Sequence, residues 1–147
     1  LREGLPFYTK PTLEYVPYIY TPLYFYVSAF MSYFTGLSFF PARLVSFISI
    51  MGTAIILYHW IQKERGGPVL GLVAAGLFLA TYKLSGRWFD VARVDSLYIF
   101  CMIAGLYVYY FKIHKCSLFI ASTLFAAAFF VKQSAIMALF PCLLAAL

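Results

Sequence analysis

The sequence predicts an all-α integral membrane protein, built as a polytopic bundle of transmembrane helices. Of its 147 residues, 64% are hydrophobic and only 11% are charged, whereas an average soluble domain carries about 25% charged residues. Aromatic residues make up 21%, including 13 tyrosines, and tyrosine is enriched where a membrane meets water. Residues 1–147 are therefore expected to form part of one transmembrane domain.

The first 42 residues are expected to form a loop at one membrane face. Residues 1–21 contain three prolines and four tyrosines. Prolines at this density prevent a continuous helix, because each lacks an N–H donor and restricts the residue before it. This part of the loop is therefore predicted to fold at the interface without crossing the membrane.

The loop is predicted to end in an interfacial helix over residues 22–35. Thr21 suits the N-cap, Pro22 the first helical position and Gly36 the stop. A helix of about 14 residues is roughly 21 Å long, shorter than the ~30 Å hydrocarbon core. The alternative is a kinked span, because residues 15–42 carry no formal charge.

Apolar stretches close to the length of a membrane span follow, separated by short charged turns. The expected spans are 43–62, 68–84, 96–111, 116–132, and a last one that begins at 135 and continues to 147. Alternation then places the tyrosine-rich loop, Arg43, Lys83–Asp95 and Lys132 on one face. That face holds seven Lys and Arg residues and the other holds four, so counting positive charges alone would make it cytoplasmic.

The most polar stretch is Lys83–Asp95, KLSGRWFDVARVD, which holds five of the sixteen charged residues. Its simplest interpretation is a solvated loop with Arg87–Asp90 and Asp90–Arg93 pairs three residues apart. The functional interpretation is a polar site at the membrane face, where ionisable residues are usually selected for a task. Lys132 ends an apolar run, so it either extends to the interface or binds an anion.

Composition also bears on partners and cofactors. Basic residues occur singly between apolar runs, which excludes the basic stripe of a nucleic-acid-binding protein and favours lipid phosphates as partners. Cys101, Cys116 and Cys142 form no CxxC motif and His59 and His114 have no ligand-spaced partner, so neither a metal nor another cofactor is expected. Both ends look cut, which suggests a fragment of a longer protein.

Several segments, in this order, resemble the GT-C membrane glycosyltransferases of the family 39-like group. That group includes the dolichyl-phosphate-mannose protein mannosyltransferases and the aminoarabinose transferases that modify lipid A. The matching segments are LREGLPFYTKP, YIYTPLYFYVSA, GLSFFPARLVS, RWFDVARVDSL and AAAFFVKQSA. The resemblance implies a GT-C type helix bundle in the inner or plasma membrane. Residues 1–42 would then be an extracytoplasmic loop, and the site would face the same side.

The resemblance also implies a reaction, in which a sugar passes from a polyprenyl-phosphate donor to a hydroxyl of a glycan, lipid or protein acceptor. The family's acidic catalytic residue would lie upstream of Leu1, so no catalytic residue is assigned in this chain. A departing phosphate needs cations aimed at its oxygens, and arginine binds phosphate through two parallel hydrogen bonds. The available cations are Arg87, Arg93, Lys132 and Lys10.

Other residues are expected to assist these cations. Asp90 and Asp95 suit the orientation of the arginines, and aromatic rings offer flat faces to a sugar or an isoprenoid chain; the rings considered are those of Tyr15, Tyr18, Tyr20, Tyr24 and Trp88. The candidate substrate-binding residues are Arg87, Asp90, Arg93, Asp95, Lys10, Tyr20 and Lys132. Two other functions stay open: a secondary transporter or flippase-like protein, and a non-catalytic assembly subunit.

Overall fold

The structure is a computed structural model that describes residues 10, 20–86, 89, 91–111 and 115–138. Helices dominate this part of the chain, and it contains no strand. The elements are α1 (Leu23–Thr35), α2 (Phe40–Ile61), the π-helical turn η1 (Gln62–Gly66), α3 (Gly67–Ala80), α4 (Val94–Phe111) and α5 (Ser117–Val131). Residues 135–138 are again helical, and the rest of the expected last span lies outside the described residues.

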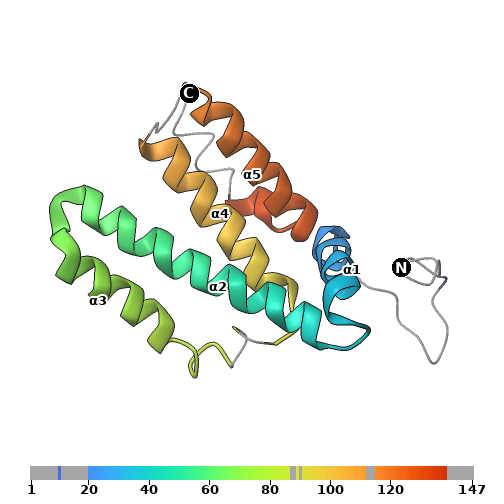
Figure 1. Cartoon of the computed structure of the whole chain (residues 1–147). Coiled ribbons are helices and arrows are strands. Elements are labelled where there is room, and N and C mark those ends of the chain that lie inside the picture. Colours follow the sequence, from blue (N-terminus) through green and yellow to red (C-terminus); the bar gives the residue numbers. More distant parts are fainter. Residues whose placement is uncertain (1–9, 11–19, 87–88, 90, 112–114, 139–147) are drawn as a thin grey trace.

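The helices pack mainly as neighbours in sequence (Figure 1). α2 and α3 form a hairpin through η1, α4 packs on α2, α5 packs on α4, and α1 lies against α2 and α5. Because successive helices reverse direction, the N-terminal ends of α2 and α4 meet the C-terminal end of α5 beside α1. Polar residues from four helices therefore come together at one end of the molecule.

Among the residues that the structure describes, two helical stretches are long and apolar enough to cross a membrane. They are Phe40–Glu64, which joins α2 to part of η1, and α4, while α3 and α5 are apolar but shorter. Large apolar side chains stay exposed on α3, which packs mainly on α2 and η1. A face of this kind suits contact with lipid, because an exposed apolar patch in water is unfavourable.

The ends of α1 agree only in part with the sequence prediction. Gly36 is confirmed as the stop, with a positive φ of 85° and an N–H bonded to the Ser32 carbonyl at 2.9 Å. The assignment of Thr21 as the N-cap is wrong, because Pro22 occupies that position. The Thr21 hydroxyl instead donates to the Phe129 carbonyl on α5, at 3.0 Å.

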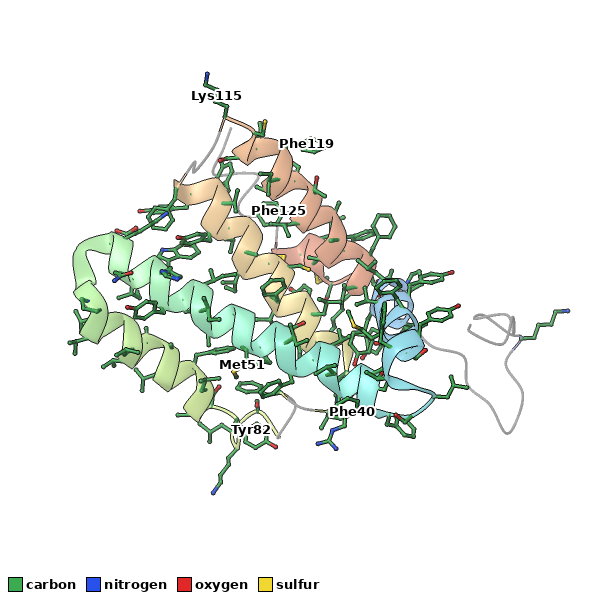
Figure 2. The ribbon with its side chains drawn as sticks, viewed as in Figure 1. Phe40, Met51, Tyr82, Lys115, Phe119 and Phe125 are labelled. Atoms are coloured by element: carbon green, nitrogen blue, oxygen red, sulfur yellow. The ribbon has the colours of Figure 1, made fainter. Side chains whose placement is uncertain are left out.

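Glycines allow the helices to approach closely. A Cβ atom added at Gly52 on α2 would lie 2.6 Å from the ring of Phe100, and one at Gly105 on α4 would lie 2.6 Å from the ring of Phe125. Figure 2 shows Phe125 between α4 and α5. Small residues at these positions therefore set the spacing of α2, α4 and α5.

The Gly71→Ala substitution is expected to destabilise the α2–α3 hairpin by about 1–2 kcal/mol. The new Cβ would lie 2.8 Å from both the backbone oxygen and the ring of Tyr58, and overpacking of this kind costs more than the ~1 kcal/mol that alanine gains over glycine in a helix. Gly76→Ala on the same helix is the control, because nothing lies within 4 Å of its Cβ position. Thermal unfolding in micelles measures both variants, and equal transition midpoints would contradict the prediction.

Candidate functional site

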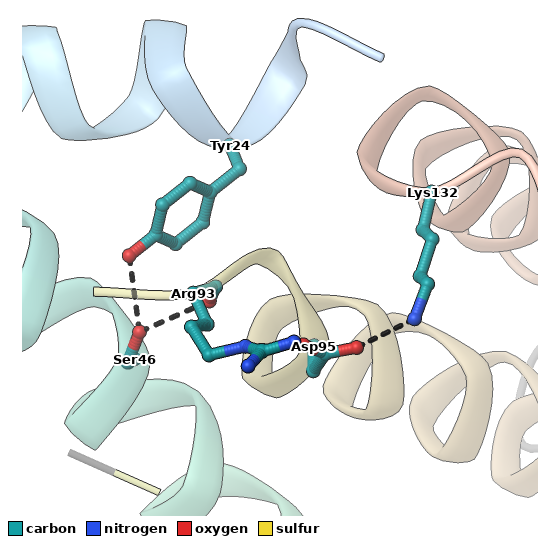
Figure 3. A network of polar contacts seen from close by, with 5 residues as sticks. All are labelled: Tyr24, Ser46, Arg93, Asp95 and Lys132. Carbon is teal, nitrogen blue, oxygen red and sulfur yellow. Dashed lines mark hydrogen bonds and ion pairs between the residues drawn. The ribbon is translucent and has the colours of Figure 1, made fainter. Parts of the chain in front are cut away.

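The site is centred on Asp95, in the first turn of α4. Arg93 donates through Nε to Oδ2 at 3.0 Å, and Lys132 donates through Nζ to Oδ1 at 2.6 Å (Figure 3). The Asp95 side chain is only 12% exposed, whereas Arg93 is 37% and Lys132 is 26% exposed. The Asp95 carboxylate thus holds two cations whose side chains are more exposed than its own. The three groups together carry one net positive charge.

Lys132 reaches this cluster because α5 ends there. Its backbone is extended, with φ −152° and ψ 120°, which turns the side chain out of the helical path. The ammonium also lies over the rings of Tyr20, at 5.7 Å, and Tyr98, at 5.9 Å, distances typical of cation–π contacts. Lys132 therefore connects the end of α5 to Asp95 at the start of α4 and to Tyr20, which precedes α1.

A second set of polar contacts ties α1 and α2 to the same place. The Tyr24 hydroxyl donates to the Ala42 carbonyl at 2.8 Å and lies 3.1 Å from the hydroxyl of Ser46. Ser46 in turn donates to the Arg93 carbonyl at 3.2 Å (Figure 3). Burial raises the pKa of Tyr24, against the opposite effect of the Ser46 and Ser28 hydroxyls, so the phenol remains a proton donor at neutral pH.

The expectation that Tyr24 presents its ring to a ligand is wrong. The side chain is 1% exposed and packs with Val45, Val94 and Val131 where α1, α2, α4 and α5 meet. A ring enclosed in this way stabilises the fold through apolar burial, and only its hydroxyl contacts the polar cluster.

The structure brings together four of the candidate substrate-binding residues: Tyr20, Arg93, Asp95 and Lys132. Lys10 is exposed, and within the described part of the chain none of the contacts of this cluster includes it. Arg87 and Asp90 lie outside the described residues, so the Arg87–Asp90 and Asp90–Arg93 pairs stay predictions. Among the described residues, Arg93 is paired with Asp95, two residues further on.

Sequence reasoning missed two of these contacts. The Asp95–Lys132 pair joins residues 37 apart, although a signal for it existed: Asp95 opens one apolar stretch and Lys132 closes the next, and an antiparallel hairpin brings such ends together. The Ser46 contact had no comparable signal, because Ser46 is one of several small hydroxyl residues on α2.

Residues 17–147 match the family model described as dolichyl-phosphate-mannose-protein mannosyltransferase. The chain belongs to this family. Comparisons with curated proteins and with solved structures gave no match. Membership of the mannosyltransferase family, together with the two long apolar helices, identifies an integral membrane protein of the glycosyltransferase class.

The mannosyltransferase match covers every residue of the Arg93–Asp95–Lys132 cluster. Within the part of the chain that the structure describes, no group of three or more His, Cys, Asp or Glu side chains is placed to hold a metal ion. The cluster carries one net positive charge next to the rings of Tyr20 and Tyr98, an arrangement whose electrostatics can attract an anion.

Proposed function

We propose that this protein transfers a sugar from a polyprenyl-phosphate donor to an acceptor hydroxyl, at the extracytoplasmic face of the inner or plasma membrane. The observation that carries the proposal is the Arg93–Asp95–Lys132 cluster, a site with net positive charge formed where helices end. Membership of the mannosyltransferase family supports the class of reaction. The acceptor is a hydroxyl of a glycan, a lipid or a protein.

The reaction breaks the bond between the anomeric carbon and the donor phosphate and forms a bond from that carbon to the acceptor oxygen. The acceptor proton passes to a carboxylate that acts as general base. Negative charge grows on the departing phosphate, and Arg93 and Lys132 are suited to stabilise it because preorganised cations act most strongly where charge develops. Asp95 fixes both cations through its two oxygens, which lowers the cost of ordering them.

The proposed membrane arrangement has α2, α3, α4 and α5 as spans of a polytopic GT-C type bundle, and the sequence predicts a further span that begins at residue 135. α1 lies at the interface, since it exposes an aromatic face that includes Tyr26, Phe30, Tyr33 and Phe34, which suits the level of the lipid headgroups. Residues 1–42 then form the extracytoplasmic loop. The meeting of α1 with the ends of α2, α4 and α5 supports a site on that same side.

The proposal is tested by measuring polyprenyl phosphate release from dolichyl-phosphate-mannose by the full-length protein in vesicles. Lys132→Gln is expected to raise the donor KM about tenfold, because a hydrogen bond to a charged group contributes about 1.5–3 kcal/mol. Lys115→Gln is the matched control: this exposed lysine lies just before α5, at the opposite end of that helix (Figure 2).

The other two functional classes give different results in the same vesicles. A flippase-like protein would move the intact donor between leaflets without releasing polyprenyl phosphate, and an assembly subunit would do neither. Either result contradicts the proposed transferase. An unchanged donor KM in Lys132→Gln would remove Lys132 from the site while leaving the reaction in place.

A further inference from the structure

Ser46 differs from the other buried hydroxyl residues of α2 in where its proton goes. Ser49 donates to the Val45 carbonyl at 2.7 Å, and Thr53 donates to the Ser49 carbonyl at 2.9 Å. This bond to the preceding helical turn is the usual way in which a helical hydroxyl is satisfied. Ser46, fully buried, instead donates to the Arg93 carbonyl, outside its own helix.

Arg93 is consequently held at its backbone and at its side chain. The residue lies one position before α4, so its own backbone is outside the regular helix. Its carbonyl accepts from Ser46 at 3.2 Å, its amide donates to the Val91 carbonyl at 2.7 Å, and its Nε donates to Asp95 at 3.0 Å. Ser46 is the contact among these that comes from another helix, and it fixes the point from which the guanidinium extends.

Tyr24 extends this connection to α1. The hydroxyls of Tyr24 and Ser46 have one proton each. These two protons are shared among three contacts: Tyr24 with the Ala42 carbonyl, Tyr24 with Ser46, and Ser46 with the Arg93 carbonyl. When Tyr24 donates to Ser46 and not to Ala42, the Ser46 proton is left for the Arg93 carbonyl. The arrangement is thus a chain of hydrogen bonds from the interfacial helix α1 to the backbone that carries the cation (Figure 3).

We propose that Tyr24 and Ser46 are positioning residues for lipid-phosphate binding. Their hydroxyls hold the Arg93 backbone where its guanidinium and the Lys132 ammonium lie on the two oxygens of Asp95. Neither residue touches the substrate, and both act through Arg93. This inference rests on the proposed function, since it concerns the same phosphate site.

The test measures the affinity of the full-length protein, in lipid nanodiscs, for polyprenyl phosphate, with the uncharged polyprenol as the comparison probe. Ser46→Ala and Tyr24→Phe are each expected to weaken polyprenyl phosphate binding about three- to tenfold, the equivalent of one hydrogen bond, and to leave polyprenol binding unchanged. Ser49→Ala is the matched control. It also removes a buried hydroxyl from α2, so it should cost similar stability without changing affinity.

A double-mutant cycle separates positioning from a purely structural effect. If Ser46 acts through Arg93, Ser46→Ala adds little to the loss already caused by Arg93→Gln, because contacting residues in one network are coupled. Effects that simply multiply, or equal affinities for Ser46→Ala and Ser49→Ala, would overturn the positioning role and leave the phosphate site standing. An Arg93→Gln variant with unchanged affinity for polyprenyl phosphate would overturn the positioning role and remove Arg93 from the phosphate site, while sugar transfer is tested separately by the release of polyprenyl phosphate.

Discussion

Replacement of Arg93 by alanine is expected to lower kcat for sugar transfer by about 100- to 1000-fold, the loss typical when one preorganised donor to a developing negative charge is removed. The Arg93 guanidinium is more than one-third exposed while its Nε is held by Asp95, so it is both accessible to a lipid phosphate and oriented. The rate of polyprenyl phosphate release at saturating donor measures the effect.

Two variants make this result specific. Arg93→Lys keeps the charge but loses the planar fork that binds phosphate with two parallel bonds, so its kcat should lie between those of wild type and Arg93→Ala. Lys83→Ala removes an exposed cation from the same polar stretch and should leave kcat unchanged. A rate for Arg93→Ala within about threefold of wild type would show that Arg93 takes no part in stabilising the departing phosphate.

Asp95→Asn is expected to lower the free energy of unfolding by about 1–3 kcal/mol. The substitution leaves the Arg93 and Lys132 cations next to each other without the carboxylate that now lies between them. Their partial exposure keeps the loss below that of a fully buried pair, because water screens the remaining charges. Denaturant titration in mixed micelles measures the change.

The double variant Asp95→Asn/Lys132→Gln tests whether repulsion between the two cations causes the loss of stability. Removing the second charge relieves the repulsion that Asp95→Asn creates, so the double variant should be more stable than the sum of the two single losses predicts. Strictly additive losses would mean that the 2.6 Å contact between Lys132 and Asp95 contributes nothing to folding.

The positions of helices in this chain could be predicted from proline, glycine and charge. Gly36 ends α1 as expected, and charged residues fall in or next to η1 and at the start of α4. These signals work because they act locally: proline lacks a donor, glycine adopts a positive φ, and a charge avoids hydrocarbon. The same reversal of direction predicted one face for Lys132 and Lys83–Asp95, but the sequence analysis did not predict the contact between Lys132 and Asp95.

The side-chain partners could not be predicted, because they depend on how each apolar helix is rotated. On α5, side-chain size does not mark the buried face: Phe119 is 75% exposed, whereas Ala121 is 1% exposed and Val131 is fully buried. In a chain that faces lipid, hydrophobic periodicity no longer marks the buried face. Tyr24 is an example: its aromatic ring suggested a surface that faces a ligand, but the ring is enclosed where four helices meet.

The limited lengths of α3 and α5 have a consequence for the surrounding bilayer. At 14 and 15 residues, they are about 21–23 Å long, against ~30 Å of hydrocarbon. If α3 and α5 span the membrane as proposed, lipids next to them would accommodate the mismatch by thinning locally, and this would lower the headgroup level toward the end of α5. The phosphate of a long-chain prenyl phosphate would then lie at the depth of Lys132 while its prenyl tail stays in the membrane. Binding would not require moving the tail into water.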